Sequence, residues 1–118
     1  MVKTALTLLF LAATVAMANE PGYQLRVDPK VEGGMLTVAP RITAPAGAQL
    51  RYEVVSSKHG SSGESNSSQS GNVTAGPDGS AKLSSLSVNV GPKDKYVLTV
   101  KVFDGAKLVA EEVVRYPQ

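Results

Sequence analysis

The stretch Lys95–Tyr116, KYVLTVKVFDGAKLVAEEVVRY, decides the fold of this chain. Its first half places an apolar residue at every second position, the pattern of a strand with one buried face: Tyr96, Leu98, Val100 and Val102. Its second half resumes the alternation: Leu108, Ala110 and Val114. Asp104-Gly105 lies between the two runs and is typical of a tight hairpin turn. The stretch therefore predicts two antiparallel strands joined by a hairpin.

The same period-two pattern recurs upstream, in runs separated by glycine- and proline-rich turns. These runs span Tyr23–Val27, Leu36–Ile42, Leu50–Val55 and Leu86–Val90. A polar strand is expected within Ser65–Ala75, and no segment after residue 18 keeps a helical period. About seven short strands predict an all-β fold, an immunoglobulin-like antiparallel β-sandwich. The Cys…Trp…Cys core of antibody domains is absent, because the chain contains neither residue type.

Gly60–Gly71, GSSGESNSSQSG, is the one low-complexity stretch. Its composition favours a solvated loop that leads into an edge strand, since polar edges resist unwanted pairing. A flexible functional loop is the alternative.

The first 18 residues have the anatomy of a secretory signal peptide. Lys3 supplies the positive start, Leu6–Val15 the apolar centre, and Ala16-Met17-Ala18 the small-residue cleavage site. The apolar run is too short for an ordinary membrane span, although an uncleaved anchor is the alternative. We expect cleavage after Ala18, a single domain over residues 19–118, and a periplasmic location.

The composition narrows the classes of function. Export without any cysteine leaves stability to strand pairing and apolar packing, and it excludes thiol redox chemistry and thiolate metal sites. Without Lys3 the chain has eleven basic and ten acidic residues, which is no nucleic-acid footprint. We expect no cofactor, no nucleic-acid partner, no membrane insertion after cleavage, and a monomer.

Residues that could form an active site are scarce. His59 is the only histidine, and it lies beside the Gly60 loop without a Gly-x-Ser-x-Gly motif that could complete a serine triad. Glu111 and Glu112 are strand neighbours, so they should face opposite sides. No calcium-loop or zinc spacing is present. We therefore expect that the protein is not an enzyme.

The outward side of the predicted hairpin sheet is the better candidate site. It combines apolar and basic residues in the manner of a protein-binding surface, although β-branched residues are also simply good strand formers. The candidate client-binding residues are Arg51, Lys101, Arg115, Lys95, Lys107, Val97, Phe103 and Val113. We expect Val55 and Val109 outward as well. Alternation turns the charged Glu112 inward, which suggests a position near the sandwich edge or at a bulge.

Three stretches resemble the CsgC/CsgH family of curli assembly proteins: Gly60–Ser65, Lys82–Val90 and Val100–Gly105. Their order and spacing, with the size, signal peptide and strand count, extend the resemblance over Leu25–Val114. The CsgC branch carries a Cys-x-Cys pair where this chain has Ala48 and Leu50. This difference favours the cysteine-free CsgH branch.

The resemblance implies a periplasmic, chaperone-like inhibitor of curli amyloid formation whose partner is the major curli subunit or a similar amyloidogenic protein. It also implies electrostatic guidance of the client, and residue type and predicted facing transfer this role to the basic residues named above. The alternative is a secreted structural or adhesive sandwich module of a fimbria. The sequence leaves open the client, the stoichiometry, and whether monomers or oligomers are bound.

Overall fold

The computed structural model describes residues 14–60 and 63–117, and these form eleven β-strands without a helix. None of the described residues belongs to a helix that could cross a membrane. The all-β prediction is confirmed. Residues 1–13 of the predicted leader lie outside the described residues, whereas residues 14–18 belong to the first strand.

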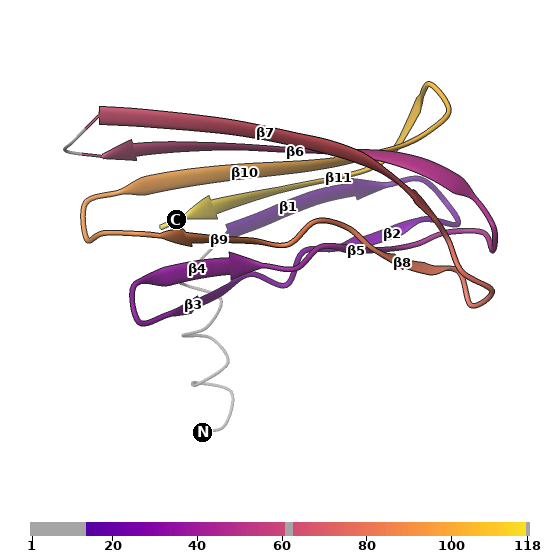
Figure 1. Ribbon diagram of the computed structural model, residues 1–118, viewed down its shortest axis with the longest axis horizontal. Helices are drawn as coiled ribbons and strands as arrows, with labels where there is room; N and C mark the ends of the chain where they lie inside the picture. Colours follow the sequence, from indigo (N-terminus) through magenta and orange to yellow (C-terminus); the bar gives the residue numbers. More distant parts are fainter. Residues whose placement is uncertain (1–13, 61–62, 118) are drawn as a thin grey trace.

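One layer of the sandwich is a five-stranded antiparallel sheet with the order β1-β11-β10-β6-β7 (Figure 1). Its strands are β1 (Thr14–Asn19), β11 (Lys107–Tyr116), β10 (Lys95–Asp104), β6 (Gln49–Gly60) and β7 (Gly63–Thr74). The predicted hairpin is its centre, and residues of β10 pair with β11 on one side and with β6 on the other.

The second layer consists of two three-stranded sheets, ordered β2-β5-β8 and β3-β4-β9 (Figure 1). Their strands are β2 (Gln24–Arg26), β3 (Lys30–Glu32), β4 (Met35–Val38), β5 (Arg41–Thr43), β8 (Ser80–Lys82) and β9 (Leu86–Asn89). The two sheets are successive halves of three chain segments, 24–32, 35–43 and 80–89. Counted as three interrupted strands beside β6, β7, β10 and β11, they confirm the predicted sandwich of about seven strands.

The interruptions have local causes. Asp28, between β2 and β3, has a left-handed φ of 50°, and Pro40, between β4 and β5, has no amide hydrogen for a ladder. Contact between the segments continues nonetheless, because the Ala39 amide donates to the Val27 carbonyl at 3.1 Å and the Leu83 amide to the Pro40 carbonyl at 2.9 Å. The predicted strand Leu36–Ile42 is therefore two short strands with a bend.

The core lies between the layers and is aliphatic. Leu25, Leu36 and Ile42 from the short strands meet Leu98 and Val100 from β10, and all are at most 1% exposed. Burial of one such side chain contributes about 1.5–3 kcal/mol, so a cysteine-free core of this kind can hold the layers together.

Tyrosine hydroxyls at the core margin add polar links. The Tyr52 hydroxyl, on β6, lies 2.7 Å from the Ser84 hydroxyl in the segment between β8 and β9. The Tyr23 hydroxyl donates to Asp104 at 2.6 Å, which ties the start of the second layer to the β10–β11 hairpin. This hydrogen bond to the carboxylate is the largest cause of a raised Tyr23 pKa.

A β-bulge changes the facing of β11. Val102 pairs with Ala110, but Phe103 pairs with Leu108, so Val109 is an extra residue in β11. Leu108 is 38% exposed, whereas Val109 is only 2% exposed. The prediction that Leu108 points inward and Val109 outward was wrong, because the bulge reverses the alternation between the turn and Ala110.

The low-complexity segment forms most of an edge strand. β7 covers Gly63–Thr74, has β6 as its one partner among the described strands, and is exposed along its first eight residues. The expected polar edge strand is confirmed, but it begins at Gly63, so little of Gly60–Gly71 is a loop.

Candidate functional site

The candidate site is the side of the five-stranded sheet that points away from the second layer. Strand register arranges it in four cross-strand rows from β6 through β10 to β11. We call this surface the outer face, and its residues are Arg51, Phe103, Leu108; Glu53, Lys101, Glu111; Val55, Thr99, Val113; and Ser57, Val97, Arg115. Six of the eight predicted client-binding residues lie on it.

The first row is organised by Arg51. Its guanidinium lies over the Phe103 ring, 4.4 Å from the centroid, and also donates to Glu53 at 2.7 Å. The Arg51 side chain is 45% exposed. Aromatic stacking and an ion pair thus fix the orientation of this cation at the surface.

The second row balances the charge of Lys101. This lysine lies on the central strand β10, opposite Glu53 on β6 and Glu111 on β11. Opposite charges in directly facing positions attract across a sheet. The outer face therefore carries three cations and two anions, a net of +1, and is much less basic than its cations alone suggest.

The third and fourth rows form an apolar strip. Val55 is 45% exposed and lies opposite Thr99, which in turn lies opposite Val113. Val97 lies two positions before Thr99 on β10, opposite Arg115. β-branched residues suit a strand at any position, but these valines, of which Val55 is exposed and Val97 and Val113 are half-buried, also offer apolar contact area to a partner.

The remaining two predicted residues lie outside these rows. Lys95 lies opposite His59, whose ring nitrogen is 3.1 Å from Glu64 on β7. Lys107 lies at the β10–β11 turn, where its ammonium is 3.4 Å from Glu20. Lys95 therefore continues the outer face toward one end of the sheet, whereas Lys107 belongs to the opposite end and is already engaged.

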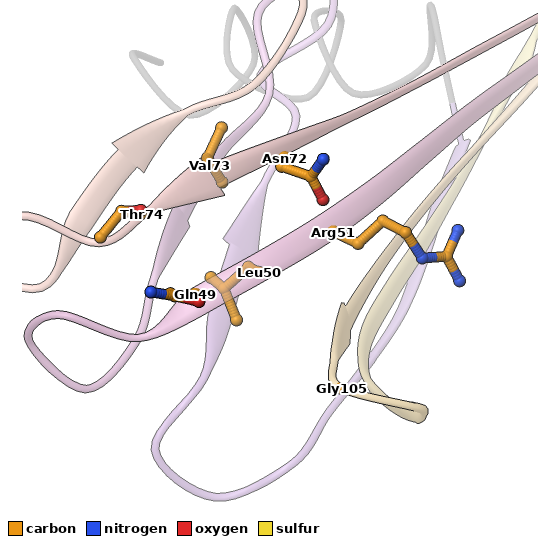
Figure 2. Close-up of a pocket in the computed structure, with 7 residues that line it drawn as sticks. All are labelled: Gln49, Leu50, Arg51, Asn72, Val73, Thr74 and Gly105. Carbon is orange, nitrogen blue, oxygen red and sulfur yellow. The ribbon is translucent and has the colours of Figure 1, made fainter.

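An open groove of about 460 Å³ adjoins Arg51 where β6 and β7 approach the β10–β11 turn. Figure 2 shows its seven lining residues: Gln49, Leu50, Arg51, Asn72, Val73, Thr74 and Gly105. The groove mixes polar and aliphatic groups without a cluster of acids, histidines or nucleophiles. Within residues 14–60 and 63–117, no three potential metal ligands gather at one place.

Glu112 is a buried carboxyl group beside the core. It is 3% exposed, and its Oε1 has no hydrogen-bond partner within the described part of the chain. Burial raises its pKa to about 7, the nearby charge of Asp28 acts in the same direction, and a hydrogen bond from the Val27 amide opposes them. Alternation correctly predicts that Glu112 points inward, but the bulge lies elsewhere in β11, at Val109, opposite Val102 and Phe103.

Comparison with solved structures supports the sandwich and identifies similar proteins. The structure of Escherichia coli curli protein CsgC is 26% identical, with a TM-score of 0.66, and the match covers 76% of this chain and 96% of that one. The solution structure of R. palustris CsgH is 23% identical, with a TM-score of 0.60, over 80% of this chain and 92% of that one. The second likeness concerns the fold alone.

Sequence comparison extends the same relationship. Curli assembly protein CsgC of Escherichia coli strain K12 is 29% identical over 102 residues, which are 86% of each chain. The protein of the same name from Escherichia coli O1:K1 is 29% identical over 85 residues, 72% of this chain and 77% of the relative. Placement in the cysteine-free branch stays a prediction from composition.

The family model extends the match further toward the N-terminus than the resemblance in the sequence. The model of the thin aggregative fimbriae synthesis proteins, Tafi-CsgC, matches residues 14–114, from the first residue of β1 almost to the end of β11. Since this match covers most of the chain, the protein belongs to the Tafi-CsgC family of thin aggregative fimbriae synthesis proteins.

Proposed function

We propose that the protein is a periplasmic, chaperone-like inhibitor that keeps the major curli subunit, or a similar amyloidogenic protein, from forming amyloid. It is exported by a leader that is cleaved after Ala18, and it acts by binding rather than by catalysis. The family and the curli assembly proteins among its relatives support the curli client. The observation that carries the binding mode is the valine strip of the outer face beside the charged row of Lys101, in which Val55 is exposed and Val97 and Val113 are half-buried.

Inhibition below equimolar ratio is possible because the nuclei of amyloid assembly are rare. Cross-β assembly begins from few early species that expose strand edges and apolar side chains. A protein that covers such surfaces delays growth even when it is far less abundant than the client. Exposed Val55 supplies contact area, and the charged rows around it set the orientation of the encounter.

The outer-face cations contribute less to client binding than their number suggests, because most of them are paired with acidic residues. Lys101 lies between two glutamates, and Arg51 is paired with Glu53. Among the described residues, Arg115 is therefore the one cation of the outer face with neither an acidic residue opposite it nor an ion pair. We therefore assign steering to a small net charge, and affinity to the valines and Phe103.

A fibrillation assay tests this function. The exported protein is purified, and its intact mass establishes whether residues 1–18 are absent. It is then titrated against a soluble curli subunit while the lag time is followed by dye fluorescence. We expect a longer lag well below equimolar ratio. Lys82→Ala, an exposed change on β8 in the other layer, should inhibit like the wild type.

Two results would overturn the proposal. The first is a lag time that no ratio of the protein changes. The second is a protein that sediments with the fibres in fixed proportion without delaying them, which would favour a structural module of the fimbria.

A further inference from the structure

Strand β1 occupies an edge of the larger sheet that the predicted export cleavage would vacate. β1 pairs with β11 from Thr14 opposite Arg115 to Asn19 opposite Ala110. Cleavage after Ala18 would leave only Asn19 of this strand. The outer edge of β11 would then lose its partner along residues 111–115.

The hydrogen-bonding groups of that edge can be assigned. The Glu20 amide donates to the Val109 carbonyl at 2.8 Å, just beyond the last β1 pair and in the same register. In an antiparallel ladder, hydrogen-bonded and non-bonded pairs alternate. The amides of Glu111, Val113 and Arg115 therefore point toward β1, whereas those of Glu112 and Val114 point toward β10.

The β11 edge specifies a register, which the opposite edge does not. Along β11, Val113 is half-buried on the outer face, whereas Val114 is 1% exposed and faces the core. A strand added at this edge and shifted by one residue would therefore turn its core-facing side chains to the outer face, and the reverse. β7 is exposed on both faces over its first eight residues and lacks this discrimination.

A buried polar atom marks the inner side of the same edge. Oε1 of Glu112 has no partner among the described residues, and Glu112 pairs with position 17 of β1. A strand residue at that position with an amide or hydroxyl side chain could donate a hydrogen bond to this oxygen. β1 itself, TVAMAN, contains no charged residue, which shows that this edge accepts an uncharged strand.

We propose that β1 is a placeholder: after export, the edge of β11 binds an extended, uncharged strand of the amyloid-forming client, with an amide or hydroxyl side chain opposite Glu112. This inference rests on the proposed function and adds a main-chain docking site to it. Such β-strand addition would occupy the client edge on which further subunits assemble.

A second copy of this protein is a poorer occupant. Antiparallel pairing of two β11 edges around Val113 would pair each Glu112 with Val114 of the other copy. The two Glu112 carboxyl groups would then be diagonal neighbours on the inner side of one ladder. An uncharged client strand brings no second carboxyl group to that place.

Substitution of Glu111 by proline tests the contribution of a single edge amide to docking. Glu111→Pro removes an amide that points to the edge and spares those that pair with β10, as proline is tolerated on edge strands. Glu111→Ala removes the same side chain but keeps the amide. Ser68→Pro is the matched control on β7, because the alternation carried through β10 and β6 also points the Ser68 amide out of the sheet.

The readouts are the protein concentration that doubles the lag time and amide hydrogen exchange by NMR with excess soluble client. We expect Glu111→Pro to require at least about threefold more protein than Glu111→Ala, which loses the same charge, and Ser68→Pro to match the wild type. Client should slow exchange at Glu111, Val113 and Arg115 by about tenfold or more, and leave Ser68 unchanged. Circular dichroism and thermal unfolding establish that each variant is folded.

The outcomes separate this inference from the proposed function. Inhibition without protection of the three amides, or inhibition by folded Glu111→Pro equal to that of Glu111→Ala, would overturn strand docking and leave the function standing. Amides already protected without client in a dimer would assign the edge to a second copy. An exported protein that retains residues 14–18 would show that β1 is permanent. Absence of inhibition by the wild type would remove the function itself.

Discussion

The guanidinium of Arg51 lies 4.4 Å from the centre of the Phe103 ring, across the β6–β10 ladder in which the two residues are directly opposite. Both side chains belong to the outer face, and Glu53 holds the same guanidinium from a second direction at 2.7 Å. The arrangement keeps a cation and an aromatic ring together at the surface. The Arg51–Phe103 contact lies at one end of the outer face, and the row of Lys101 separates it from the valine strip.

A double-mutant cycle measures this contact. We expect Arg51→Ala and Phe103→Leu to show a coupling free energy of about 0.5–1 kcal/mol in urea unfolding, as for exposed cation–π pairs. Arg115→Ala combined with Phe103→Leu is the control and should be additive, since Arg115 lies opposite Val97 instead. A coupling near zero for the first pair would mean that the stacking contributes nothing to stability.

Stability should fall with rising pH because of Glu112. Its pKa is raised from 4.5 to about 7 in the folded protein. Below about pH 4.5 the carboxyl group is protonated in both states and costs nothing. Between these two pH values Glu112 is ionised mainly in the unfolded state, so the free energy of unfolding decreases as the pH rises. Above about pH 7 the loss is complete, on the order of 3 kcal/mol at 1.36 kcal/mol per pKa unit.

Urea unfolding of the full chain between pH 4.5 and 8 tests this dependence. Glu112→Gln cannot ionise, so its unfolding free energy should change much less over that range. Glu111→Gln, one residue away on the outer face, should keep the wild-type slope. Equal slopes for the wild type and Glu112→Gln would assign the pH dependence to other groups.

The bulge in β11 gives two neighbouring residues opposite sensitivities. Val109→Ala should lower the unfolding free energy by on the order of 2 kcal/mol, because Val109 is 2% exposed and its loss leaves a cavity. Leu108→Ala should change it by no more than about 0.5 kcal/mol, because Leu108 is 38% exposed. Reversed magnitudes in urea unfolding would place the bulge elsewhere.

Most of the architecture could be predicted from the sequence, because period-two alternation and Gly/Pro turns determine strands locally. The β11 bulge could not: its residues fit two phases of alternation, and only pairing with Val102 and Phe103 decides between them. The interruptions at Asp28 and Pro40 likewise depend on how three segments pair in one layer.

The candidate site was predictable in its facing but not in the pairing of its charges. Alternation places Arg51, Lys101 and Arg115 on the outer face, as the register does. The two glutamates opposite Lys101 depend on which residues face each other across strands, which a single sequence does not determine. β1 was missed because its residues also have the small, apolar character of a leader and its cleavage site.

The contribution of the valine strip can be measured without changing charge. Val55→Ser/Val113→Ser keeps the net charge and exposes less apolar surface. We expect it to raise the protein concentration that doubles the client lag time by at least about fivefold, at low and at high salt, since loss of contact area is not screened. Thr99→Ser, in the same row, is the matched control for a mild change. Full inhibition by the folded double variant would remove the strip from the client site.

The role of charge is tested by two variants that change the net charge of the outer face in opposite directions. Arg51→Ala/Lys101→Ala/Arg115→Ala changes its net charge from +1 to −2, and Glu53→Gln/Glu111→Gln changes it to +3. For a client of negative charge, the first variant should shorten the lag time at low salt and the second should lengthen it. Exposed charges contribute little to folding, so both variants should unfold much like the wild type.

Salt provides the control for these two variants. At 0.1 M ionic strength the screening length is about 10 Å, so raising the salt further should bring the lag times of both variants toward that of the wild type. The wild type should itself lose part of its inhibition. Because steering acts mainly on encounter, the difference should lie in association rates rather than in dissociation rates. A folded triple variant that inhibits like the wild type at low salt would show that these three cations do not guide the client.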